Sequence, residues 1–224
     1  MKRKNIALLV LALVFLTGGW LIFNSTCKDA GKFQPTTTQQ RMSDHGNLQA
    51  IDSGIHMLKT GDLVVRTGND ITSYMLCKVN WRDKTYSHCG LVVVENGYPF
   101  VYHSIGGEDN PDELLRRDSA SFWFSPEHNL GYGIVRLDIP EEQQEPLIKQ
   151  IRQFYTERKK FDMDFDLATD DRFYCAEFVS KTIALATGDS NYFTPTSILG
   201  YRYMGIDDLF LSKHANIICQ IRYK

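Results

Sequence analysis

The sequence predicts an α+β domain, with a mostly antiparallel sheet packed on helices, behind an N-terminal apolar targeting segment. Two observations predict this class. Asn96-Gly97 is a strong hairpin signal between two apolar runs. Hairpins and amphipathic helical patterns are also mixed along the chain, without a regular alternation of strand and helix. The 224 residues are 43% hydrophobic with a net charge of -2. This composition is typical of a globular protein with a hydrophobic core, and the small negative net charge does not favour binding to nucleic acid.

The N-terminus carries a targeting signal. Lys2, Arg3 and Lys4 precede an apolar run from Ile6 to Phe23. Either Ile6–Leu16 is the core of a signal peptide that is cleaved, or Ile6–Phe23 spans a membrane once and tethers the protein to it. Both alternatives place the rest of the chain outside the cytoplasm, in the cell envelope, because the basic residues stay inside. We therefore expect residues 1–23 to be a signal peptide or anchor.

The folded part is expected to begin after a linker. Residues 24–47 are rich in Thr, Gln, Ser, Gly and Lys, which predicts a flexible tether. The catalytic or binding domain then covers residues 48–224. Its expected elements, in chain order, are a helix over Leu48–Met57, a strand over Leu63–Arg66, a helix capped by Asp70, strands over Ser87–Glu95 and Pro99–Ser104, a long loop over Gly106–Asn129, a strand over Tyr132–Asp138, helices after Pro140 and over Cys175–Thr187, and a strand over Ala215–Arg222.

Two segments could supply a thiol nucleophile and its base. Cys175 opens a predicted helix, where the dipole lowers the pKa of a thiol. His88 lies at the entrance of a strand, and an imidazole there can accept the thiol proton. His103 lies on the returning strand and can orient His88 only if the two rings share a face of the sheet, which their spacing does not decide. The backbone N–H of Cys175, after Tyr174, is a natural oxyanion donor.

The remaining cysteines and acidic residues indicate no metal or cofactor. The five cysteines form no CxxC pair, which excludes zinc-knuckle and thioredoxin motifs. We expect Cys89 to be a core residue, and Cys77 and Cys219 to be buried thiols or one disulfide. Asp162-x-Asp164-x-Asp166 resembles the start of a calcium loop, but the sixth and twelfth positions are not the required Gly and Glu.

Four ordered motifs resemble the circularly permuted papain-like amidases of the YaeF/YiiX type, which are related to NlpC-type cell-wall peptidases and to lecithin:retinol acyltransferase. The motifs are Leu58-Lys59-Thr60-Gly61-Asp62-Leu63, Ser87-His88-Cys89-Gly90, Phe161-Asp162-x-x-Phe165 and Tyr174-Cys175-Ala176-Glu177-Phe178-Val179. The resemblance implies a permuted papain-like (NlpC-type) fold, Cys175 as nucleophile, His88 as base and a third polar residue that His103 fits. Ala176 departs from the commoner Ser of the family.

The leading hypothesis is an exported cysteine hydrolase that cleaves an amide bond in a peptide or amino-acid conjugate, such as a peptidoglycan fragment. The alternatives are a lipid acyl-hydrolase or acyltransferase, and a non-catalytic envelope binding domain. No substrate-binding residue is assigned from sequence. Aromatic residues that could line a substrate cleft are Trp123, Tyr192, Phe193, Tyr201 and Tyr203.

Overall fold

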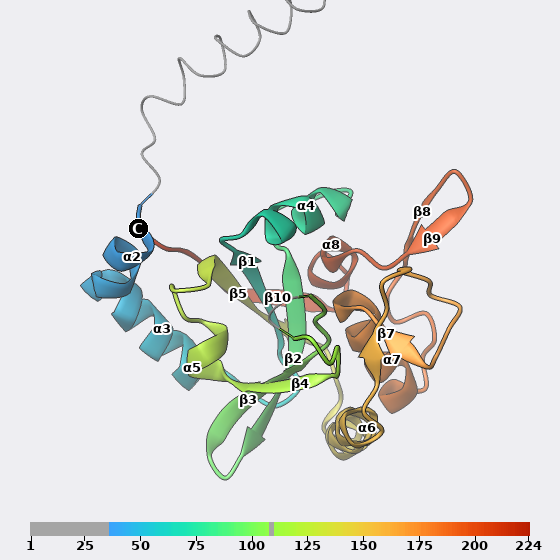
Figure 1. Cartoon of the computed structure of the whole chain (residues 1–224). Helices are drawn as coiled ribbons and strands as arrows, with labels where there is room; N and C mark the ends of the chain where they lie inside the picture. Colours follow the sequence, from blue (N-terminus) through green and yellow to red (C-terminus); the bar gives the residue numbers. More distant parts are fainter. Residues whose placement is uncertain (1–35, 108–109) are drawn as a thin grey trace, which may run out of the picture. The chain divides into compact units, whose positions relative to one another are not determined.

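The computed structural model describes residues 36–107 and 110–224, and the fold below is that of the compact unit Thr38–Lys224. A six-stranded antiparallel sheet with the order β10-β5-β1-β2-β3-β4 forms its centre (Figure 1). The strands are β1 (Leu63–Gly68), β2 (His88–Glu95), β3 (Tyr98–His103), β4 (Arg116–Ser119), β5 (Asn129–Leu137) and β10 (Ala215–Arg222). The predicted α+β class with a mostly antiparallel sheet packed on helices is confirmed.

Helices and two small sheets surround this sheet. The helices are α2 (Thr38–Ser43), α3 (His45–Met57), α4 (Ile71–Val79), α5 (Ala120–Trp123), α6 (Gln144–Thr156), α7 (Cys175–Thr187) and α8 (Ile206–Phe210), with a 3-10 turn η1 (Glu141–Gln143) before α6. The small sheets pair β6 (Lys160–Phe161) with β7 (Arg172–Phe173), and β8 (Thr196–Ile198) with β9 (Tyr201–Tyr203).

The central sheet is covered on both faces, and its side chains alternate between two cores. In β2, Leu91 and Val93 belong to the core that includes the apolar residues of α6 and α7. Val92 belongs to the other core, with Trp123 of α5 and the partly buried side chains of α3. Figure 1 accordingly shows α3 and α5 on one side of the sheet and α6 and α7 on the other. Burial on both faces explains why β2 is almost continuously apolar.

Local sequence signals place most elements where they were expected. Asn96 and Gly97 both have positive φ angles, 51° and 82°, as the two central residues of a type I′ hairpin turn require. The Asp70 side chain accepts a hydrogen bond from the N–H of Ser73 at 2.8 Å and so caps α4. Gly188 ends α7 in the left-handed conformation, with φ 72°.

The predicted tether is wrong for its last ten residues, because α2 and α3 already occupy residues 38–57. Long-range contacts fix this segment, and local composition does not reveal them. The Nε of Arg41 donates to the carbonyl of Pro126, and the amide of Asn47 donates to the carbonyl of Lys224 at 3.2 Å. The rest of the predicted tether before Thr36 and the predicted signal peptide or anchor of residues 1–23 lie outside the described residues. Within the described part, no helix combines the length and apolarity needed to cross a membrane.

The predicted loop over Gly106–Asn129 is also wrong in part, because it contains β4 and α5. Strand β4 has the sequence Arg116-Arg117-Asp118-Ser119, which shows no apolar alternation. Its extended conformation comes from pairing with β3 at the edge of the sheet. This edge strand supplies one member of the candidate site.

Candidate active site

Three polar side chains lie on the same face of three adjacent strands. In the β2–β3 pair, Leu91 is opposite Tyr102, so Gly90 continues the register opposite His103. His88 is two residues before Gly90 and therefore shares the face of His103. In the β3–β4 pair, Asp118 is opposite Val101, two residues before His103, and shares that face as well. The condition left open by the sequence for His103 is thus met.

The three side chains form a continuous hydrogen-bonded chain. His88 Nε2 lies 2.8 Å from His103 Nδ1, and His103 Nε2 lies 2.9 Å from Asp118 Oδ2. An ionised carboxylate only accepts hydrogen bonds, so His103 carries its proton on Nε2. His103 Nδ1 is then an acceptor, and His88 donates to it from Nε2. The remaining nitrogen of His88, Nδ1, then carries a lone pair, and the neighbouring Cys175 acts to raise the pKa of His88.

Asp118 is an anion in this chain. Burial by itself raises the pKa of its carboxyl group, but the hydrogen bond from His103 and the neighbouring Arg116 guanidinium bring the pKa below its usual value. Arg116 lies 3.1 Å from the second oxygen of Asp118. The charged end of the chain is therefore held by two partners, and its position is fixed.

The imidazoles are enclosed by aromatic and cationic groups. The Trp123 ring, which is fully buried, lies with its centroid 5.2 Å from His88 and 4.8 Å from His103. The Arg66 guanidinium lies over the same indole, 4.5 Å from its centroid. Burial lowers the pKa of His88 and of His103 to about 4 in each case. Both rings are thus neutral in the resting site at neutral pH, and His88 is in the form that accepts a proton.

Cys175 is the first residue of α7 and is 9% exposed. Two neighbours, the buried Cys89 through its thiol and backbone N–H, and His88, favour the ionised form of its sulfur. They lower the pKa of the Cys175 thiol well below its ordinary value, although burial opposes them. The prediction that Cys89 is a core residue is confirmed, but its contact with the nucleophile was not foreseen.

The helix start that presents Cys175 is held from several sides. The N–H of Tyr174 donates to the buried carboxylate of Glu177 at 3.2 Å, and Lys181 lies 3.0 Å from the other oxygen of that carboxylate. The Tyr174 hydroxyl accepts a hydrogen bond from the N–H of Met204 at 2.7 Å. The Tyr174 side chain therefore connects the start of α7 to the segment that contains Met204. The backbone N–H of Cys175 lies at the first helical position, where N–H groups have no partner within the helix.

Other residues of the four motifs have structural roles. A Cβ on Gly90 would come within 2.8 Å of the carbonyl oxygen of Tyr102, so only glycine lets β3 approach β2 next to His88. The buried Asp62 accepts two hydrogen bonds from Arg136, each of 2.9 Å, and one from the N–H of Lys59. The buried Asp162 accepts from the N–H groups of Asp164 and Asp166 and shapes the loop before β7. These contacts give the Asp162 side chain a role in the conformation of the loop.

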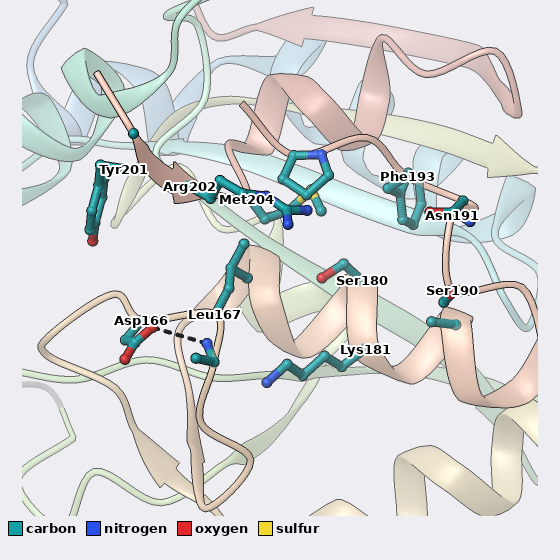
Figure 2. Close-up of a pocket in the computed structure, with 14 residues that line it drawn as sticks. Asp166, Leu167, Ser180, Lys181, Ser190, Asn191, Phe193, Tyr201, Arg202 and Met204 are labelled. Carbon is teal, nitrogen blue, oxygen red and sulfur yellow. Dashed lines mark hydrogen bonds between the residues drawn. The ribbon is translucent and has the colours of Figure 1, made fainter. Parts of the chain in front are cut away.

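The remaining sequence candidates lie in several different surroundings. Cys77 and Cys219 are free thiols, so the alternative of a disulfide between them is wrong. Tyr192 and Tyr203 are mainly buried. Phe193 and Tyr201, with Ser180, Arg202 and Met204, line a cavity of about 520 Å³ beside α7 (Figure 2). Neither Cys175 nor His88 lines this cavity, which lies further along α7.

Sequence reasoning missed Asp118 and the contact from Cys89. Asp118 could have been found only by recognising β4 as a strand, since its face follows from the register. The direction of the Cys89 thiol depends on how α7 packs against β2, which no local pattern encodes. Within the described residues, no group of three or more His, Cys, Asp or Glu side chains is placed to hold a metal ion.

Comparison with known proteins supports one relationship. No family model matches the chain. The chain is 26% identical over 132 residues to the uncharacterized protein YiiX of Escherichia coli (strain K12), a match that covers 58% of this chain and 59% of the relative. It thus matches about three fifths of the length of that relative. The crystal structure of the metalloprotein YiiX from Escherichia coli O157:H7 superposes with a TM-score of 0.60 at 19% identity, over 73% of this chain and 98% of the other. The chain is therefore a sequence relative of YiiX and shares its fold.

Proposed function

We propose that this protein is a cysteine hydrolase with a permuted papain-like fold, which cleaves an amide bond through an acyl-enzyme on Cys175. The observation that supports this proposal best is the hydrogen-bonded chain His88–His103–Asp118, together with the effect of His88 in lowering the pKa of the Cys175 thiol. A nucleophile, a base and an orienting group in hydrogen-bond reach are the parts that covalent catalysis by a thiol requires. A buried structural cysteine would need none of them.

The proposed reaction begins with transfer of the thiol proton of Cys175 to Nδ1 of His88. The thiolate attacks the carbonyl carbon of the amide, and the oxyanion that forms faces the N–H groups at the start of α7. When the C–N bond breaks, His88 returns the proton to the leaving amine. Water then attacks the thioester, giving its proton to His88, and the carboxylic acid product leaves with regeneration of the thiol.

His103 and Asp118 act when His88 becomes charged. The imidazolium is disfavoured by burial, as the low pKa of the ring shows. The dipole of His103, fixed by the Asp118 carboxylate, offsets part of this cost because its Nδ1 lone pair points at the proton on His88 Nε2. We assign both as positioning residues, since neither touches the reacting atoms.

The proposed substrate is a peptide or an amino-acid conjugate, and the proposed location is the cell envelope. The support for the location is the basic start and the apolar run from Ile6 to Phe23. The proposed reaction uses no metal ion. The solved YiiX structure is described as that of a metalloprotein, whereas in this protein His88 Nε2 and both ring nitrogens of His103 are engaged in hydrogen bonds.

The test is to incubate the purified full-length chain with peptidoglycan peptides, N-acyl amino acids and phospholipids, and to trap the covalent intermediate for mass spectrometry. The proposal predicts an acyl adduct on Cys175 with an amide substrate, and release of an amine. Cys175→Ala should remove adduct and turnover while the circular dichroism spectrum stays unchanged, and Cys77→Ala is the matched control. Full turnover by Cys175→Ala would contradict the proposal.

A second candidate, lipid acyl hydrolysis or transfer, is favoured by the exposed apolar side chains of α4. The same incubation separates the two candidates. Release of fatty acid from phospholipid in water would indicate a lipid hydrolase, and a product that forms only with an added acyl acceptor would indicate a transferase.

A further inference from the structure

The outward face of α4 is apolar, in contrast to the polar outward face of an ordinary surface helix. Ile71, Tyr74, Met75 and Val79 recur at helical spacing and are between 46% and 75% exposed. The buried position of this helix is Cys77. The larger apolar side chains of this helix therefore face solvent, and such an exposed apolar face is expected to be covered by an apolar partner.

This face continues beyond the helix. Trp81 follows α4 and is 63% exposed. Leu199, at the turn between β8 and β9, is fully exposed, and Tyr201 beside it is half exposed. The Tyr203 hydroxyl of β9 donates to the carbonyl of Val79 at 2.9 Å, which ties the β8–β9 hairpin to the end of α4. Figure 1 shows the helix and the hairpin at the same end of the molecule. We name these residues of α4, Trp81 and the hairpin the apolar rim.

The composition of the apolar rim matches the interface of a lipid bilayer. Tryptophan and tyrosine favour the headgroup level, and lysine covers apolar surface with its stem while its charge stays in water. Lys78 lies on the rim, 4.6 Å above the Tyr74 ring. Lys84 follows Trp81 closely, and Arg202 lies in the hairpin. A single projecting leucine at a hairpin tip suits insertion into a deformable lipid layer better than a fit against a rigid second copy.

The N-terminal sequence supports the same partner. The apolar run Ile6–Phe23 has the length of a membrane span, and residues 24–37 can extend over at most about 50 Å. An anchored chain would keep the unit Thr38–Lys224 within that distance of a bilayer. A weakly apolar surface then docks readily, because the anchor raises its effective concentration at the membrane.

We infer that the apolar rim docks on a lipid bilayer and holds the Cys175 site next to it. The connection to the site is direct. Met204, next to Tyr203 of the hairpin, donates its N–H to the hydroxyl of Tyr174, and Tyr174 precedes the nucleophile. Docking does not require that Cys175 be catalytic, so this inference is independent of the proposed reaction.

The test uses Trp81 as an internal probe. Of the two tryptophans in the described residues, Trp81 is exposed and Trp123 is fully buried. The full-length chain with Trp20→Phe is reconstituted in vesicles of phosphatidylethanolamine and phosphatidylglycerol, with and without a phosphatidylcholine that carries bromine near the headgroup end of its acyl chain. Docking predicts that brominated lipid quenches the Trp81 emission and that acrylamide in the water phase does not. The further variant Trp81→Phe should retain only the unquenched emission of Trp123.

Two substitutions test whether the rim itself is responsible. Met75→Asp in the same background places a charge on the rim. We expect it to lower the equilibrium constant for docking by about tenfold or more, so that the bromine quenching is lost. Val94→Asp is the matched control, because Val94 is exposed at the far end of β2, and it should leave the quenching unchanged. Three results would overturn the inference: no quenching by brominated lipid, equal losses in Met75→Asp and Val94→Asp, or protection of Trp81 from acrylamide before lipid is added, which would show that a second copy or residues 6–23 cover the rim.

Discussion

Asp118→Asn is the most informative substitution in the proposed site, because it removes the negative charge of the carboxylate and keeps the size and shape of the side chain. Asp118 touches no reacting atom, and it is connected to the two histidines by the 2.9 Å hydrogen bond to His103. A hydrogen bond to a charged group contributes about 1.5–3 kcal/mol, against about 1 kcal/mol for a neutral one. The difference of about 1–2 kcal/mol predicts a fall in kcat/KM of roughly five- to thirtyfold.

The pH dependence separates a positioning role from a general loss of stability. Removing the carboxylate charge makes the imidazolium of His88 less favourable, which raises the pKa of the Cys175 thiol. The acid limb of the kcat/KM profile should therefore move to higher pH in Asp118→Asn. Glu95→Gln is the matched control, because Glu95 is a carboxylate of similar burial that binds Tyr102 and Arg117.

The assay is amide hydrolysis by the full-length chain from pH 5 to pH 9, with each variant in the wild-type and in the His103→Asn background. Because Asp118 acts through His103, the loss in Asp118→Asn should shrink once His103 is replaced. An unshifted acid limb, or a loss of equal size in both backgrounds, would refute the reasoning that connects Asp118 to the nucleophile.

Three further predictions concern neighbouring groups. Cys89→Ala removes the thiol donor but keeps the backbone N–H, so the pKa of the nucleophile should rise without reaching its ordinary value, as measured by the pH dependence of alkylation. Asp62→Asn weakens the paired hydrogen bonds to Arg136 and should lower the free energy of unfolding by about 1–3 kcal/mol in urea titrations, with little change in kcat. His88 and His103 have a pKa of about 4 when folded and about 6.5 when unfolded. The unfolded chain therefore takes up protons first as the pH falls. The free energy of unfolding should be highest above pH 6.5 and should decrease towards pH 4, by roughly 3 kcal/mol for one histidine. A free energy of unfolding that stays constant over this interval would contradict the burial of both rings.

The sequence predicted the elements with strong local signals and missed those that depend on distant contacts. The hairpin at Asn96-Gly97 and the helix that starts at Cys175 follow from turn and capping chemistry, and both are found as expected. The helix at Thr38 is different. Its Arg41 is buried because it reaches Pro126, 85 residues away. No property of the polar segment itself records that contact.

The same distinction applies to the candidate site. Cys175 and His88 could be found because each occupies a recognisable position at the start of an element. The face of His103 required the register of a hairpin, and Asp118 required a charged edge strand that lacks apolar alternation. Site members become less visible in the sequence as their positions depend more on pairing between strands and less on local pattern.

The proposed reaction depends on surroundings that turn the Cys175 thiol into a nucleophile. The most direct measurement is the rate of alkylation of each cysteine by iodoacetamide as a function of pH, followed by peptide mass spectrometry on the full-length chain. We expect Cys175 to titrate well below the ordinary thiol value of about 8.5, and His88→Ala to move the titration upward. Burial raises the pKa of Cys219, so that thiol should titrate above the ordinary value. A Cys175 thiol that titrates at or above the ordinary value, or whose titration does not respond to His88→Ala, would show that these surroundings do not activate it.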